Sequence, residues 1–157
     1  NPKEVGADRV VGAVAAHYLY GKPVIIIDLG TAITFDVVSQ DGDYLGGAIA
    51  PGIDVAVEAL FARTAMLPRI RLIRPKRVIG RSTVAAMQSG IIFGYIELIE
   101  GMIQRIQKEL GSQAKVVATG SYGHLVARET SAIDIVNPDL VLTGLRLIYE
   151  MNAGSNA

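Results

Sequence analysis

The sequence has 157 residues, about the length of a single globular domain. Half of the residues are apolar and 19% are charged, so the chain can build a buried core and has too little charge for a disordered segment. Fifteen basic residues balance fifteen acidic ones, which leaves no overall field to attract nucleic acid or an anionic membrane. No cysteine and two histidines exclude disulfides, thiolate metal sites, a cysteine nucleophile and a three-histidine zinc site. We therefore expect one domain, no membrane partner and no nucleic-acid partner.

The beginning of the chain gives no targeting signal. Residues 1–4 lack the basic and then apolar profile of a signal peptide, and no apolar run approaches the ~18 residues of a membrane span. The chain also begins without a methionine, which favours a fragment or a processed chain.

The first third of the sequence predicts a helix followed by three strands. A helix over residues 5–20 is expected to end at Gly21, with Pro23 just beyond it. The β-branched run 24–27 is typical of a strand buried on both faces. Residues 33–39 and 44–50 predict two further strands joined by a tight turn at 41–43, which makes a three-stranded meander.

The rest of the sequence alternates helices and strands. The predicted elements are a helix over 53–66, a helix over 82–111, a strand over 115–118, a helix over 122–128, a strand over 133–136 and a final helix opened by Pro138. Ser82 is the expected N-cap of the long helix, and Gly90 and Gly94 are its expected points of interruption. Along that helix, Met87, Ile91, Tyr95 and Leu98 recur at helical spacing and predict a core or subunit-interface stripe.

This order of elements predicts the fold class. A three-stranded meander followed by alternating helices and strands differs from a doubly wound Rossmann fold and matches a ribonuclease-H-like α/β domain, the half-unit of actin-like ATPases and kinases. Such a domain is expected to form a nucleotide site at the ends of its strands.

Two short polar motifs stand at such positions. Residues 28–31, Asp-Leu-Gly-Thr, place a carboxylate, a glycine and a hydroxyl at the end of a buried strand, which suits a phosphate and its cation. An ordinary turn explains the same four residues equally well. Residues 6–9, Gly-Ala-Asp-Arg, place an acid and a base at the opening of the first helix, where an aspartate is also simply a good partner for the helix dipole.

Longer strings decide between these interpretations. Residues 1–9 resemble the opening of the second half of type III pantothenate kinases, and further strings resemble the same family in the same order along essentially the whole chain. These strings are residues 28–32, 46–52, 65–68, 79–83, 88–90 and 119–120.

The resemblance implies an actin-like enzyme that transfers a phosphoryl group from ATP to the primary hydroxyl of pantothenate, the first step toward coenzyme A. Such enzymes are typically cytoplasmic homodimers that use ATP with Mg²⁺ and a monovalent cation, K⁺ or NH₄⁺. The residues that match the family's functional positions then have these implied roles: Asp8 as catalytic base, Gly6, Ala7, Asp8, Arg9 and Thr83 in pantothenate binding, Asp28 as the cation ligand, and Gly30, Thr31, Thr119 and Gly120 in ATP binding. Sequence alone leaves open whether Arg9 meets the carboxylate of pantothenate or a phosphate oxygen.

The chain also departs from the family pattern. The family's first half, with its own phosphate loop, is absent, so we expect residues 1–157 to be a single pantothenate-side domain that is inactive alone. Ile33 stands where the family usually has a second threonine, and Ser121 stands where it usually has a second glycine. The ATP contacts are therefore less well matched than the pantothenate side.

Two alternatives to this function remain open. The segment 69–81 contains six basic residues and no acid, so the chain could be a non-catalytic binding or regulatory module that holds a partner there. Interleaved apolar residues and the lack of an aromatic in the segment favour an ordinary solvated surface. The second alternative is a related actin-like kinase with another small hydroxylated substrate. His17 and His124 have no metal-like spacing and are expected to be structural or surface residues.

Overall fold

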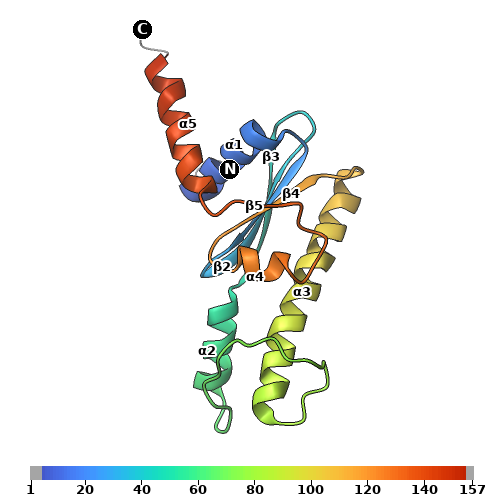
Figure 1. The fold of residues 1–157 in the computed structure, drawn as a ribbon. Coiled ribbons are helices and arrows are strands. Elements are labelled where there is room, and N and C mark those ends of the chain that lie inside the picture. The colour runs from blue at the N-terminus through green and yellow to red at the C-terminus, as the bar shows by residue number, and fades with distance from the viewer. Residues whose placement is uncertain (1–4, 155–157) are drawn as a thin grey trace.

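The computed structural model describes residues 5–154 and is built around one five-stranded sheet (Figure 1). The strands are β1 (Val24–Leu29), β2 (Ala32–Val38), β3 (Tyr44–Pro51), β4 (Lys115–Thr119) and β5 (Ile135–Val136). The helices are α1 (Ala7–Tyr20), α2 (Ile53–Arg63), α3 (Thr83–Leu110), α4 (Gly123–Ala127) and α5 (Leu140–Gly154). The strand order is β3-β2-β1-β4-β5, with β1, β2 and β3 antiparallel in turn and β4 and β5 parallel to β1. The predicted meander and ribonuclease-H-like order are confirmed.

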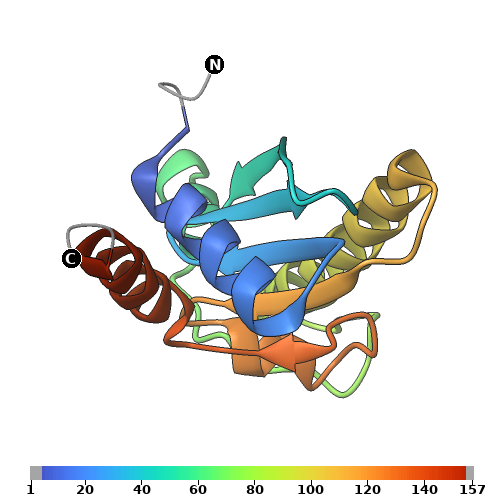
Figure 2. The ribbon, with the colours of Figure 1, turned by 90° about the horizontal axis from the view of Figure 1, so that it is seen from above.

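The two faces of the sheet carry two separate apolar clusters. Because side chains alternate along a strand, Ile25 and Ile27 face one side and Val24 and Ile26 face the other. The first side packs against α3 and α4, and the second, called the α1 face, packs against α1. Helix α5 lies beside α1, whereas the strands separate α1 from α3 (Figure 2).

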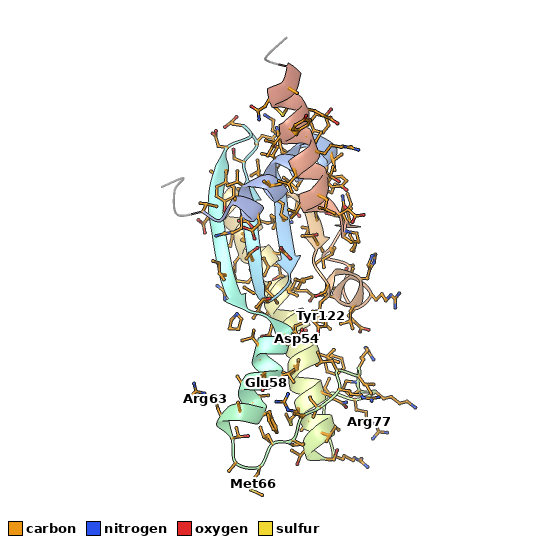
Figure 3. All side chains as sticks on the ribbon, turned by 90° about the vertical axis from the view of Figure 1, so that its left-hand side faces the viewer. Asp54, Glu58, Arg63, Met66, Arg77 and Tyr122 are labelled. Atoms are coloured by element: carbon orange, nitrogen blue, oxygen red, sulfur yellow. The ribbon has the colours of Figure 1, made fainter. Side chains whose placement is uncertain are left out.

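An arm projects beyond the sheet (Figures 1 and 3). It consists of α2, the connection 64–82 and the first half of α3. The hydroxyl of Tyr122, just before α4, donates to Asp54 Oδ1 at 2.5 Å, and that of Tyr95 donates to the Pro51 carbonyl at 2.9 Å, so the base of the arm is tied to the end of the sheet. Apolar side chains farther along the arm are exposed, including Met66 at 89% and Ile79 at 83%.

The structure corrects several predicted boundaries. Helix α3 runs unbroken for 28 residues, so the expected interruption at Gly90 or Gly94 is wrong. Its predicted ends are confirmed, because the Ser82 side chain accepts a hydrogen bond from the Ala85 amide and Gly111 adopts a left-handed conformation. Helix α2 ends three residues earlier than predicted, β5 has two residues rather than four, and α5 begins at Leu140.

The apolar stripe of α3 belongs to the core of this chain. Met87 and Ile91 are buried, and Tyr95 and Leu98 pack against the cluster that covers the opposite face from α1. The stripe therefore serves the first of its two predicted roles.

We predict that Gly94→Ala stabilises the protein by about 0.5–1 kcal/mol, because alanine favours a continuous helix and no atom lies within 4 Å of the added methyl group. Gly80→Ala is the matched control and should lower the free energy of unfolding, since its Cβ would lie 2.4 Å from the Ala86 backbone nitrogen. Urea unfolding measures both changes. A loss of stability in Gly94→Ala would contradict the unbroken helix.

Candidate functional site

Polar side chains gather on the α1 face at the carboxyl end of β1. Asp28 is the fifth residue of β1, and it pairs with Thr34 of β2 on one side and Thr119 of β4 on the other. Asp36 pairs with Ile26, one step back along the same face. The side-chain alternation that buries Val24 and Ile26 under α1 thus places these four polar residues on one surface.

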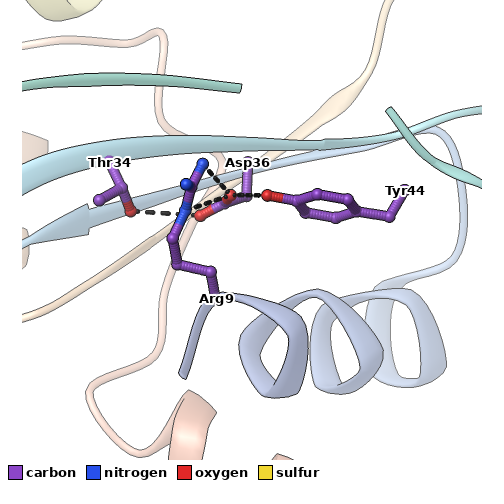
Figure 4. Close-up of polar contacts among 4 residues, drawn as sticks. All are labelled: Arg9, Thr34, Asp36 and Tyr44. Atoms are coloured by element: carbon purple, nitrogen blue, oxygen red, sulfur yellow. Dashed lines mark hydrogen bonds and ion pairs between the residues drawn. The ribbon is translucent and has the colours of Figure 1, made fainter. Parts of the chain in front are cut away.

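Asp36 is the centre of a hydrogen-bonded network (Figure 4). Its side chain is buried, and its Oδ1 accepts from Arg9 Nε at 2.8 Å, from Arg9 Nη2 at 2.7 Å and from the Tyr44 hydroxyl at 2.6 Å. The Thr34 hydroxyl donates to Oδ2 at 3.2 Å. Four protein donor contacts therefore hold the Asp36 carboxylate, three of them on Oδ1 and one on Oδ2.

This network controls the charge of its members. Burial works against the charge of Arg9, but the hydrogen bond and negative charge of Asp36 outweigh it, so the pKa of Arg9 is raised. Burial, with the hydrogen bond to Asp36, raises the pKa of Tyr44 to about 12. Arg9 therefore stays cationic, and Tyr44 stays a hydrogen-bond donor.

Asp28 has the opposite environment. It is half-buried, and no donor among residues 5–154 bonds its carboxylate. Burial, followed by the negative charges of Asp8 and Asp36, raises the pKa of Asp28. A bound cation would relieve this unfavourable charge, so Asp28 fits the role of a cation ligand on chemical grounds.

The turn after β4 covers Asp28 closely. Gly120 has a φ of 85°, and a Cβ there would lie 2.5 Å from Asp28 Oδ1 and 2.7 Å from the Leu29 backbone. Only glycine suits both this positive φ and the close approach of Asp28 and the Leu29 backbone. Gly30 is less constrained, because its Cβ would lie 3.5 Å from Asp28 Oδ1, and its amide already donates to the Ala32 carbonyl at 3.1 Å.

Asp8 is exposed in the first turn of α1 and has no hydrogen-bond partner within the described chain. Its carboxylate lies over Gly6, where a Cβ would approach Asp8 Oδ1 to 2.6 Å. Its charge contributes to the raised pKa of Asp28, which puts the two carboxylates within electrostatic reach. An exposed carboxylate without a donor can accept a proton from a hydroxyl group.

The other predicted residues lie at different distances from this cluster. Ala7 opens α1 beside Asp8, and Thr31 is exposed in the β1–β2 turn, where its carbonyl accepts from the Gly52 amide at the start of α2. Thr83 lies at the start of α3, near the tip of the arm (Figure 1). Helical rise separates it by ~24 Å from Ile99, one of the α3 residues in the core cluster of the sheet, and α1 lies at the other end of the molecule (Figure 1). One copy of the chain therefore does not bring Thr83 to Asp8.

Sequence reasoning missed Asp36, Tyr44 and Thr34. The signal was present, because Asp36 is the one charged residue of β2, and a buried charge requires a partner. The two departures from the family pattern also have a structural explanation. Ile33 faces the opposite side of the sheet from Asp28 and is 1% exposed, whereas Ser121 is exposed and its hydroxyl donates to the Leu29 carbonyl at 3.5 Å.

The basic segment is partly neutralised. Arg69 pairs with Glu58 at 2.9 Å and stacks over Phe61, and Arg74 pairs with Glu129 at 2.5 Å and lies over Phe93. The segment forms no helix or strand. These contacts favour the interpretation as solvated surface.

The two histidines show no metal-site geometry. Within residues 5–154 no group of three or more acidic or histidine side chains could hold a metal ion. His17 is half-buried with its Nδ1 unpaired, and His124 is exposed on α4.

Comparisons with known proteins give the family. The family model described as type III pantothenate kinase matches residues 1–105. A type III pantothenate kinase of Moorella thermoacetica is 57% identical over 97% of this chain, and one of a Geobacillus species is 53% identical over the same share. The chain belongs to the type III pantothenate kinase family.

This member of the type III pantothenate kinase family spans about 60% of the length of the curated relatives that it matches. Solved structures agree with the fold. A Campylobacter jejuni protein of the Baf family matches 97% of this chain and 67% of its own, with a TM-score of 0.70 at 23% identity. The Alp12 filament structure matches 93% of this chain and 53% of its own, with a TM-score of 0.60 at 8% identity.

The actin-like fold class predicted from the order of elements is thus confirmed for this member of the family. No helix in the part of the chain that the structure describes is both long and apolar enough to cross a membrane.

We predict that Gly120→Ala removes any response of the melting temperature of this chain to K⁺, because the added methyl group displaces the Asp28 carboxylate. Backbone strain should also cost about 1–3 kcal/mol. Gly111→Ala is the matched control, since Gly111 also has a positive φ but has no atom within 4 Å of the added Cβ. The measurement is thermal unfolding over a KCl titration at constant ionic strength. An unchanged K⁺ response in Gly120→Ala would contradict the assignment of Asp28.

Proposed function

We propose that the protein to which this chain belongs phosphorylates pantothenate with ATP, and that residues 1–157 supply the acceptor side of the reaction as one domain. The observation that carries the proposal is the different environment of three neighbouring carboxylates. Asp36 is bonded by protein donors at both oxygens and holds Arg9, whereas Asp8 and Asp28 have no protein donor among the described residues. In this arrangement Arg9 can bind an anionic acceptor, Asp8 can accept a proton and Asp28 can bind a cation.

In the proposed reaction, the primary hydroxyl oxygen of pantothenate attacks the γ-phosphorus of ATP. A new oxygen–phosphorus bond forms, the bond from the γ-phosphorus to the bridging oxygen of ADP breaks, and ADP leaves with that electron pair. Asp8 accepts the hydroxyl proton, and Gly6 leaves room for its carboxylate. Arg9, with Gly6 and Ala7, lines the pantothenate side.

The proposed nucleotide site lies at the strand ends. Gly30, Thr31, Thr119 and Gly120 surround the end of β1, and the start of α2 adjoins Thr31. Asp28 holds a monovalent cation, K⁺ or NH₄⁺, which supplies positive charge near the phosphates, while Mg²⁺ accompanies ATP. Because the Gly30 amide is already bonded, the phosphates must be met by other donors.

The proposed enzyme needs more than this chain. Its curated relatives are longer, and in the resemblance the first phosphate loop belongs to the part that is missing here. We therefore expect residues 1–157 alone to bind pantothenate weakly and to lack kinase activity. A cytoplasmic location belongs to the same proposal.

A homodimer follows from the position of Thr83. If Thr83 contacts pantothenate, it must come from a second copy, because the arm carries it away from Asp8 of its own chain. The exposed apolar side chains of the arm, such as Met66, Ile79 and Val84, suit such a contact between copies.

We predict that Asp8→Asn in the full-length protein lowers kcat by about 10²–10⁴, because the amide cannot accept the hydroxyl proton. The pantothenate KM should change little. Asp41→Asn, at an exposed aspartate in the β2–β3 turn, is the control and should retain full activity. Steady-state kinetics with pantothenate and ATP give both constants. Full activity in Asp8→Asn would refute the base assignment.

We predict that inactive Asp8→Asn and Thr83→Ala full-length proteins restore activity when mixed. After subunit exchange, about half of the dimers are mixed, and each has one site with both native residues, so activity should reach about a quarter of the wild-type value. Each variant mixed with wild-type protein is the control for exchange. A mixture that stays inactive despite exchange would show that Thr83 does not act across the dimer.

A further inference from the structure

We propose that Asp36 is a positioning residue that fixes the guanidinium of Arg9 so that its remaining donors bind the carboxylate of the acceptor substrate. This inference rests on the proposed function and deepens it. It also decides between the two ligands that the sequence left open for Arg9, the acceptor carboxylate and a phosphate oxygen.

Asp36 is suited to holding another residue and not to chemistry of its own. It is 2% exposed, and four donor contacts from three residues occupy its carboxylate. A carboxylate that is almost fully buried and is held by protein donors at both oxygens is poorly placed to receive a substrate proton or a cation. Its effect on a reaction must therefore pass through the side chains that it holds.

The geometry leaves one edge of Arg9 available. Both Nε and Nη2 point to the same oxygen of Asp36, and Nη1 has no partner within residues 5–154. Behind the guanidinium lies β3, where a Cβ on Gly47 would come within 3.2 Å of Arg9 Nη2. Gly47 is the register partner of Asp36, so α1, β2 and β3 together restrain the guanidinium.

The position along the sheet favours the acceptor over the phosphates. Asp36 pairs with Ile26, two residues before Asp28, so the carboxylate that holds Arg9 stands ~7 Å along the sheet from Asp28, the residue that Gly120 covers. Arg9 also follows Asp8 directly in α1, and Asp8 is the proposed partner of the acceptor hydroxyl. A guanidinium with fixed orientation suits a carboxylate, the planar anionic group that pantothenate carries.

The test uses the full-length protein and compares Asp36→Asn, Tyr44→Phe and Arg9→Lys with the Asp41→Asn control. Asp36→Asn should raise the pantothenate KM at least tenfold, with kcat and the ATP KM within about twofold of wild type. Tyr44→Phe removes one donor to Asp36 and keeps its charge, so the same KM should rise by a smaller factor. The pantothenate KM of the double variant Asp36→Asn/Arg9→Lys should be no higher than that of the more impaired single variant. Both changes disrupt the same interaction between the positioned guanidinium and the substrate carboxylate, so their effects should not add.

A purely structural role would give a different result. In that case kcat and both KM values would deteriorate together, and this outcome would overturn the proposal, as would an unchanged pantothenate KM in Asp36→Asn. If Asp36→Asn does not fold, Tyr44→Phe decides by the same split between the two KM values.

A second measurement separates this inference from the proposed function. In ¹⁵N NMR spectra of the full-length protein, the Arg9 Nε–H should be protected from exchange in wild type and in Asp41→Asn, and unprotected in Asp36→Asn. A wild-type protein that fails to phosphorylate pantothenate contradicts the proposed function, whatever the NMR result. An unprotected Arg9 Nε–H in wild type contradicts the positioning role.

Discussion

Strand β2 carries a carboxylate where the fold allows almost no water, and much of the candidate site depends on how the chain satisfies it. A buried charge is strongly unfavourable unless hydrogen bonds and an opposite charge surround it. Asp36 receives these from Arg9 in the first turn of α1, from Tyr44 at the start of β3 and from Thr34 on its own strand. The same contacts hold the Arg9 side chain, which follows Asp8 in α1, against the sheet.

Three aspartates near this site thus differ in their surroundings. Asp36 is buried among protein donors and anchors Arg9, Asp28 is half-buried with no donor among residues 5–154, and Asp8 is exposed over a glycine. Burial, followed by the charges of Asp8 and Asp36, raises the pKa of Asp28, so its negative charge is unfavourable there. Sites that concentrate like charges in this way commonly bind cations or move protons, which agrees with a phosphotransferase of the pantothenate kinase family.

Much of the fold could be predicted from the sequence because its signals are local. The β-branched run in β1, the Ser82 cap and the left-handed Gly111 mark their elements directly. The interruption at Gly90 or Gly94 was wrong because packing of the α3 stripe on the core outweighs the weak helix propensity of two glycines. The short β5 was overestimated because a two-residue strand has too little pattern to set its bounds.

The site was predictable only as far as its motifs are contiguous. Residues 6–9 and 28–31 were recognised as strings, and the structure brings Asp8, Arg9 and Asp28 to one face. The Arg9–Asp36 pair spans 27 positions and depends on strand register, which no local pattern specifies. Likewise, the length of α3 and its direction, and not its sequence motif, separate Thr83 from Asp8.

A crystal structure of the full-length protein with pantothenate would place both ends of the substrate relative to Asp8 and Arg9. We expect the primary hydroxyl within about 2.6–3.2 Å of the Asp8 carboxylate and the substrate carboxylate against the outer edge of Arg9, with Asp36 still bonded behind it. Pantothenate bound with its hydroxyl away from Asp8, or with Arg9 turned from Asp36 to a phosphate, would show that the roles proposed for Asp8 and Arg9 are wrong.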